Sequence, residues 1–194
     1  MIAYLAGKFT YKNPTVVYVD VNGIGYEVNI SLNTYAKIQT LSEGKLFTHL
    51  QVKEDAHVLY GFFDAYEKEM FIMLISVSGI GAATARMMLS NMLPDEISRA
   101  IIQGNARQLE SVKGIGKKTA ERLVLELRDK VSKQPIDNSI NAVKNNSLQQ
   151  DALNALVALG ISKSVAEQSV NKILSEEPSE THLEFIIKKA LKAI

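Results

Sequence analysis

The first third of the chain carries short apolar runs separated by turn residues, a pattern typical of β-strands. The β-branched stretch Val16–Val21 leads into Asn22 and Gly23, so a hairpin is expected to return through Tyr26–Ile30. A short helix is expected directly after it, and further strands over Leu46–Val52 and His57–Phe63. About five short strands within roughly 60 residues favour a small Greek-key barrel such as the OB-fold.

Beyond Asp64 the apolar positions recur at the spacing of a helix rather than a strand. Between Glu67 and Val77 they are separated by one, three and three residues, and helical patterns continue to about Val131. The charged residues 67–69 are expected on a solvated face of the first of these helices. The region 64–131 is therefore predicted to be a helical domain.

Capping residues predict where two of these helices begin and end. Asp95 is expected to cap one helix, and Gly104 to end it. Asn105 is expected to cap the next helix, with Leu109 and Val112 facing the core. Short helices joined in this way can pack as hairpins.

The last third of the chain changes composition twice. Residues 132–149 hold a proline, four asparagines and few apolar groups, which predicts a mobile linker. Residues 150–194 then show amphipathic helical patterns interrupted at Gly160 and Pro178, which predicts a three-helix unit. A core this small tends to leave apolar surface for a partner. Candidates for either the core or a docking surface are Leu156, Leu159, Ile173 and Ile187.

A glycine motif occurs twice within the helical region. The stretches VSGIGAATARMM at 77–88 and VKGIGKKTAERL at 112–123 place Gly79 and Gly114 at equivalent positions, 35 residues apart. Each copy lies between amphipathic segments, as a helix–hairpin–helix would. The repeat is more informative than a single G-x-G, which often marks only a tight turn without a ligand.

The chemistry of the motif suits a phosphate. Gly114 and Gly116 allow a sharp bend, Ile115 can anchor it, and a helix is expected to begin near Lys117. The first amides of that helix lack intrahelical partners and lie at the positive end of its dipole. The candidate DNA-binding residues in the two copies are Gly79, Ile80, Gly81, Ala82, Ala83, Gly114, Ile115, Gly116, Lys117, Lys118 and Arg122.

Other ligand-binding modes fit the motif less well. GIGKKT lacks the spacing of a nucleotide-binding P-loop, and no strand is expected before it. No helix offers the Arg, Asn and Gln face of a major-groove reader. Two hairpins related by a pseudo-twofold axis can instead grip the two backbones of a duplex across the minor groove. The prediction is sequence-independent, structure-selective DNA binding.

Composition limits how such binding can work. The chain has 22 Lys and Arg against 21 Asp and Glu, a formal net charge of +1, so bulk charge cannot hold DNA. It has no cysteine and three scattered histidines, so no metal or other cofactor is expected. No apolar run approaches the length of a membrane span and no leader pattern opens the chain, which predicts a cytoplasmic protein.

Taken in order, several motifs make the chain resemble the RuvA family of Holliday-junction-binding proteins. They are MIAYLAGKF with NGIGYEV, VKEDAHVLYGF, VSGIG, GIGKKTAERLVLEL and ALVALGIS, and they span the whole chain. The resemblance implies an α+β multidomain fold: an OB-fold barrel over 1–63, a tandem helix–hairpin–helix domain over 64–131, a linker over 132–149 and a three-helix, UBA-like domain over 150–194.

The resemblance also implies an assembly and its partners. It implies a non-catalytic homotetramer, or an octamer on DNA, that holds a four-way junction open and square. The third domain would recruit the hexameric ATPase RuvB, and the junction resolvase RuvC is a further implied partner. Family members carry an acidic pin at a β-hairpin tip, and the matching residues are Glu54 and Asp55. From the residues alone a solvated turn is the preferred interpretation of these two.

One feature departs from the family pattern, and other functions stay open. A basic residue is expected shortly after the second glycine of the first hairpin, but Ala82 and Ala83 stand there and the nearest cation is Arg86. Alternatives are a generic duplex-binding accessory of a repair nuclease, a helix–hairpin–helix DNA glycosylase and a protein-binding adaptor. The glycosylase would need a positioned Lys or Asp in a base-sized pocket, and the adaptor gives no reason for GIGKK.

Overall fold

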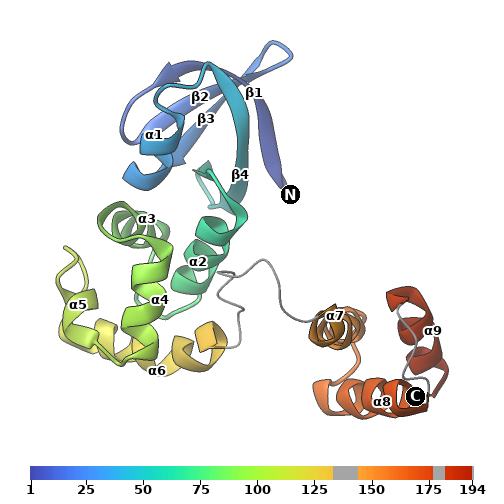
Figure 1. Cartoon of the computed structure of the whole chain (residues 1–194). Helices are drawn as coiled ribbons and strands as arrows, with labels where there is room; N and C mark the ends of the chain where they lie inside the picture. Colours follow the sequence, from blue (N-terminus) through green and yellow to red (C-terminus); the bar gives the residue numbers. More distant parts are fainter. Residues whose placement is uncertain (133–143, 177–181, 194) are drawn as a thin grey trace. The chain divides into compact units, whose positions relative to one another are not determined.

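The computed structural model describes residues 1–132, 144–176 and 182–193 (Figure 1). The chain divides into two compact units, residues 1–135 and 136–194. The first unit contains both the predicted barrel and the predicted helical domain, and the second contains the C-terminal helices.

The N-terminal barrel is a closed sheet of short strands. The strands are β1 (Tyr4–Lys12), β2 (Val16–Val21), β3 (Ile24–Ile30), β4 (Glu43–Val52) and β5 (His57–Phe62). They close in the order β1-β2-β3-β5-β4, and β3 and β5 form the parallel pair. Helix α1 (Leu32–Ile38) connects β3 to β4. The predicted OB-like barrel is thus confirmed.

Local sequence explains the β2–β3 hairpin. Asn22 and Gly23 both have positive φ, 53° and 88°, as a two-residue turn that follows strand twist requires. On the strands, Val17 and Val19 from β2 and Val28 from β3 are fully buried, while their neighbours point outward. The alternation seen in the sequence therefore becomes the inner face of the barrel.

The helical domain follows without a break. Its helices are α2 (Ala65–Ile75), α3 (Ala82–Asn91), α4 (Pro94–Ile102), α5 (Ala106–Glu110) and α6 (Lys117–Ser132). Their core includes Tyr60 and Phe62 from β5, and the Phe62 and Phe71 rings lie 4.9 Å apart. The barrel and the helical domain consequently share apolar packing.

Two predictions for this domain are wrong. Asp95 does not cap α4: the helix begins one residue earlier, at Pro94, whose fixed φ suits a first helical position. The side chain of Glu96 accepts a hydrogen bond from the Leu93 amide, at 2.8 Å, and so supplies the cap interaction. Glu67 does not lie on a solvated face either, since it is only 1% exposed.

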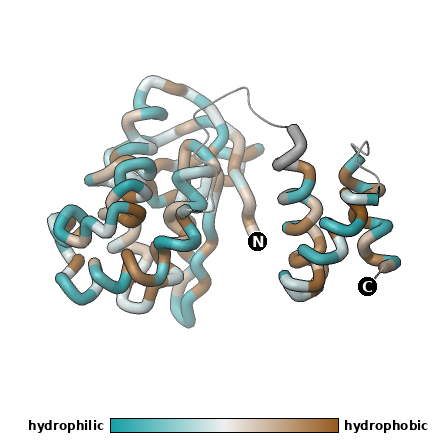
Figure 2. The backbone as a smooth tube through the Cα atoms, turned by 60° about the horizontal axis from the view of Figure 1, so that its bottom comes forward, coloured by the Kyte–Doolittle hydropathy of each residue, from teal (hydrophilic) through white to brown (hydrophobic). Residues whose placement is uncertain are grey.

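The second unit consists of α7 (Lys144–Ala158), α8 (Lys163–Glu176) and α9 (Leu183–Ala193). Apolar residues recur as bands along these helices (Figure 2). Gly160 has a φ of 92° and ends α7 as predicted. Most of the predicted linker, 133–143, lies outside the described residues, as does Pro178. Residues 144–149 were wrongly assigned to that linker; they are helical, and Leu148 packs against the core of this unit.

Candidate nucleic-acid interface

The two glycine motifs form hairpin turns with the same backbone geometry. Gly79 and Gly114 have φ values of 94° and 95°. The next residue donates its amide back across each turn: Ile80 to the Val77 carbonyl and Ile115 to the Val112 carbonyl, both at 3.1 Å. The sequence repeat is therefore a structural repeat, with α2 and α3 around the first turn and α5 and α6 around the second.

The isoleucine between the glycines anchors each turn. Ile80 and Ile115 are each 5% exposed and lie in the core of the helical domain. Their side chains are therefore unavailable to a ligand, and only their backbone can take part in binding. Of the predicted DNA-binding residues, Ala82 is buried in the same way.

The second glycine of each motif is not required by the fold. Gly81 has an extended backbone, with φ −85° and ψ 167°, and Gly116 is likewise outside the left-handed region. A Cβ at either position would meet no atom within 4 Å. The space beside each second glycine is open, so a ligand can approach the main chain there.

Unpaired amides lie next to that open space. The first i→i−4 bonds of α3 and α6 come from Ala85 to the Gly81 carbonyl (2.9 Å) and from Ala120 to the Gly116 carbonyl (3.0 Å). The amides of residues 81–83 and 116–118 precede these bonds and have no intrahelical acceptor. Amides with this geometry, at the positive end of a helix dipole, suit a phosphate oxygen.

The two hairpins differ in charge. Lys113, Lys117 and Lys118 are all exposed at the second hairpin, whereas residues 76–85 around the first contain no Lys or Arg. Lys113 was not among the candidate residues predicted from the sequence. It occupies the position equivalent to Ser78 in the first copy, so aligning the two motifs residue by residue would have found it.

Arg122 connects the two hairpins instead of projecting freely. Its Nη1 donates a hydrogen bond to the carbonyl of Ser78, at 3.1 Å, across 44 residues of sequence. Arg122 is exposed, and a guanidinium has five N–H donors, so a phosphate contact is still possible. In this structure, however, the hydrogen bond joins α6 to the first turn.

Arg86 faces the barrel. Its Nη1 donates to the carbonyl of Thr15, at 3.1 Å, and to Oδ1 of Asn29, at 2.9 Å. Arg86, the nearest cation to the first hairpin along the chain, is thus engaged in the contact between the barrel and the helical domain. Any phosphate at that hairpin would depend on the main chain of residues 79–83, with Arg122 as the cation bonded to the same turn.

Glu54 and Asp55 lie at the tip of the β4–β5 hairpin. Val52 and His57 pair across its base, and the Lys53 amide donates to the Ala56 carbonyl at 2.8 Å. Both acidic side chains are exposed. The predicted turn between two strands is therefore present, with two carboxylates at its outer end.

In the second unit, burial distinguishes core residues from candidate docking residues, a distinction that the sequence left open. Leu156 and Ile173 belong to its core, at 0% and 2% exposure, and so do not form a docking surface. Ile187 is half-buried against that core. Leu159, just after α7, is 62% exposed. Of the predicted docking residues, Leu159 is the most accessible.

The described residues offer neither a metal-binding cluster nor a membrane-spanning helix. Across the ranges 1–132, 144–176 and 182–193, no cluster of three or more His, Cys, Asp or Glu could hold a metal ion. In the same ranges no helix is long and apolar enough to cross a membrane.

Comparisons with known proteins cover nearly the whole chain. Family models match at residues 1–61 (RuvA N terminal domain), 71–129 (SAM-like helix-hairpin-helix tandem) and 147–194 (RuvA, C-terminal domain). A protein of Cytophaga hutchinsonii is 47% identical over 197 residues, covering 99% of each chain. One of Christiangramia forsetii is 48% identical over 194 residues, covering all of both chains. Both are named Holliday junction branch migration complex subunit RuvA.

Proposed function

The chain belongs to the RuvA family, and from that premise we propose that it binds four-way DNA junctions without reading their sequence. It would hold the junction for a branch-migration complex and would catalyse no reaction itself. The observation that carries the proposal is the pair of hairpin turns, whose unpaired amides border open space. The names of the relatives support the same activity.

Each hairpin would bind one backbone of a duplex arm. Amide donors at residues 81–83 and 116–118 would bond to phosphate oxygens, which are the same for every base pair. The net charge of +1 fits this mode, because a few directed donors need no general excess of cations. Affinity should fall with salt, with a log–log slope of about 0.9 for each phosphate neutralised by a cation.

The two hairpins would contribute unequally. At the second, Lys113, Lys117 and Lys118 would add charge-assisted contacts to the amide donors. At the first, the main chain would act without lysines beside it, because Arg86 is bonded to the barrel and Arg122 already donates to the Ser78 carbonyl. The absence of a basic residue at Ala82 and Ala83 would therefore weaken the first hairpin relative to the second but would not remove a binding site.

The acidic tip of the β4–β5 hairpin would act at the centre of the junction. We propose a homotetramer in which each protomer holds one arm, so that Glu54 and Asp55 bring eight carboxylates together. A carboxylate and a phosphate about 10 Å apart repel by roughly 0.4 kcal/mol in water, and several such pairs add up before salt screens them. The repulsion would keep strands apart at the crossover and disfavour continuous duplex there.

The second unit would recruit the motor. We assign it the binding of the RuvB ATPase, with RuvC as a further partner of the complex. The exposed apolar side chains Val157, Leu159 and Val165, at 43%, 62% and 39% exposure, form the candidate docking surface. An apolar contact of this kind can bind a partner without the charge needed for DNA.

Binding and mass measurements test the proposal together. The full chain should bind a synthetic four-way junction more tightly than a linear duplex of equal length and arm sequence. Native mass should give four copies alone, and four or eight with the junction. Equal affinity for both DNAs would instead support a generic duplex-binding accessory protein, and a monomer on the junction would exclude the fourfold arrangement.

A charge-neutral variant tests the acidic tip. The double substitution Glu54→Gln and Asp55→Asn should strengthen binding to linear duplex, because the repulsion at the centre is removed, and should change the rate of branch migration with the ATPase. Unchanged duplex affinity and unchanged rate would reduce this tip to an ordinary solvated turn.

A further inference from the structure

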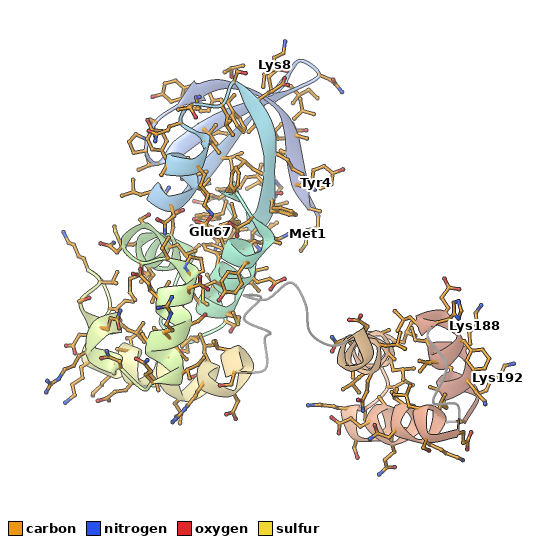
Figure 3. All side chains as sticks on the ribbon, in the orientation of Figure 1. Met1, Tyr4, Lys8, Glu67, Lys188 and Lys192 are labelled. Atoms are coloured by element: carbon orange, nitrogen blue, oxygen red, sulfur yellow. The ribbon has the colours of Figure 1, made fainter. Side chains whose placement is uncertain are left out.

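A buried glutamate joins the barrel to the helical domain. Glu67 lies in the first turn of α2, is 1% exposed and sits between the two domains (Figure 3). Thr34 donates its hydroxyl to Oε2 of Glu67 at 2.7 Å, and Ser31 donates its hydroxyl to Oε1. Both donors belong to the start of α1 in the barrel, so the carboxylate connects α1 directly to α2.

The direction of both hydroxyl bonds is fixed by the surrounding backbone. Ser31 Oγ already accepts from the Thr34 amide at 3.0 Å, and Thr34 Oγ1 accepts from the Phe63 amide at 3.1 Å. The two hydroxyl protons therefore point at Glu67. A carboxylate accepts at both oxygens, whereas a glutamine amide accepts at one and presents a competing donor at the other.

The charge of Glu67 does not serve stability. Burial is the main reason that the pKa of Glu67 is raised, while the hydroxyl bonds oppose the shift. The charged groups near it are Asp64, which raises the pKa further, and Lys37, which lowers it. Lys37 contacts Asp64 at 2.6 Å, so its charge is already shared. A raised pKa means that ionised Glu67 costs folding free energy at neutral pH.

The hydrogen bonds of Glu67 lie where the barrel strand β5 and helix α2 meet, and this position suggests a role for its buried charge. The Thr34 hydroxyl accepts a hydrogen bond from the amide of Phe63, directly after β5. The other end of β5 leads to the acidic tip. Glu67 opens α2, and the far end of α2 leads into the first hairpin turn. One group of hydrogen bonds thus lies between the acidic tip and the first phosphate-binding turn along the chain.

The position of the first hairpin turn depends strongly on the angle between α1 and α2. Helix α2 has 11 residues, a length of about 16 Å. A rotation of about 10° at its start would move the first turn by roughly 3 Å, while hydrogen-bond lengths vary by only about 0.5 Å. A small change in the α1–α2 contact is therefore enough to displace the first hairpin relative to the acidic tip.

We infer that Glu67 is a positioning residue that fixes the angle between the barrel and the first hairpin and so sets the preference for four-way junctions over linear duplex. This inference rests on the proposed function. A linear duplex needs only the two hairpins, which α6 and Arg122 hold together. A junction also requires the hairpins to be placed correctly relative to the acidic tip, and Glu67 sets that placement at the α1–α2 contact, beside the Arg86 bonds to the barrel.

The test compares Glu67→Gln with the wild-type full chain on both DNAs. The variant should keep its duplex affinity within about twofold and lose roughly tenfold in junction affinity, the scale expected for misplacement by an ångström or more. Glu27→Gln is the matched control, because it removes the same charge at an exposed position of β3. It should leave both affinities unchanged. Thermal unfolding identifies the folded variants.

A second pair of variants decides the outcome if Glu67→Gln does not fold. Thr34→Ser keeps the hydroxyl and should behave as wild type, whereas Thr34→Val removes it and should lower junction affinity selectively. Folded Glu67→Gln or Thr34→Val protein with wild-type preference for junctions would overturn the inference. If the wild type itself shows no preference, the proposed function fails, and that result is distinct from a failure of the positioning role.

Discussion

The two glycines of each motif should have separable roles, and replacing them one at a time with alanine shows this. The first, Gly79, has a φ of 94°, which an alanine adopts only with strain. Gly79→Ala should therefore lower the free energy of unfolding by about 1–3 kcal/mol. The second, Gly81, has an extended backbone and open space where the methyl group would stand.

Opposing effects nearly cancel in the stability of Gly81→Ala. Alanine is a poorer N-cap than glycine by roughly 0.5–1 kcal/mol. It also restricts the unfolded chain, which stabilises the fold by about 0.4–1 kcal/mol. The net change in unfolding free energy should therefore stay within about 1 kcal/mol of zero.

DNA binding should respond differently. The methyl group of Gly81→Ala would stand where a phosphate has to approach the amides of residues 81–83. Losing one hydrogen bond to a charged group costs about 1.5–3 kcal/mol, which corresponds to roughly ten- to a hundredfold in affinity. Gly116→Ala should behave similarly, with a smaller loss because the lysines beside it remain.

Urea unfolding and fluorescence anisotropy with a labelled junction measure the two quantities on the same preparations. The expected result is a stable Gly81→Ala protein that binds weakly and a destabilised Gly79→Ala protein. A stable Gly81→Ala protein that binds the junction as tightly as wild type would refute the reasoning, because the open space beside Gly81 would then not be a phosphate site.

Neutralising single charged side chains should separate those that bind DNA from those that hold the fold. Lys118→Gln should weaken binding and lower the salt slope by about 0.9, whereas Arg86→Gln should leave the slope unchanged and reduce unfolding free energy by about 1–3 kcal/mol; equal affinity losses would contradict this asymmetry. Arg122→Gln should weaken binding but change the salt slope by less than the loss of a phosphate contact would. A change in slope equal to that of Lys118→Gln would mean that Arg122 contacts a phosphate directly. Because the folded pKa of Glu67 is raised, its contribution is favourable below the ordinary value of 4.5 and is lost as pH rises through the folded pKa. The free energy of unfolding of wild type relative to Glu67→Gln, measured in urea, should fall as pH rises above 4.5, and a difference independent of pH would contradict the raised pKa.

Local features of the fold could be predicted from the sequence. Asn22 and Gly23 specified a hairpin turn because few residues adopt positive φ in succession. The repeat of valine, glycine, isoleucine and glycine specified two equal turns, and Ile115 proved to be the anchor it was expected to be. The barrel and the helical domain followed from hydrophobic spacing, since that spacing depends only on the local backbone period.

Predictions failed where the partner of a polar side chain lies far away in sequence. Glu67 was expected in solvent, but it is bonded to Ser31, 36 residues earlier. The hydrogen bond of Arg122 to Ser78, 44 residues earlier, was not anticipated either, and the phosphate contact of Arg122 stays a prediction. The spacing of charges along a helix gives no sign of which segment will cover them.

The sequence by itself determined most elements of this protein, the two equivalent glycine turns and the family to which it belongs. Turn chemistry and hydrophobic period act over a few residues, so the order of residues is enough to fix them. Only the tertiary structure decided which cations remain available at the hairpins and which carboxylate is buried between domains. Those choices depend on which surfaces meet when the chain packs, and a side chain with several possible hydrogen-bond partners takes the one that packing brings within reach.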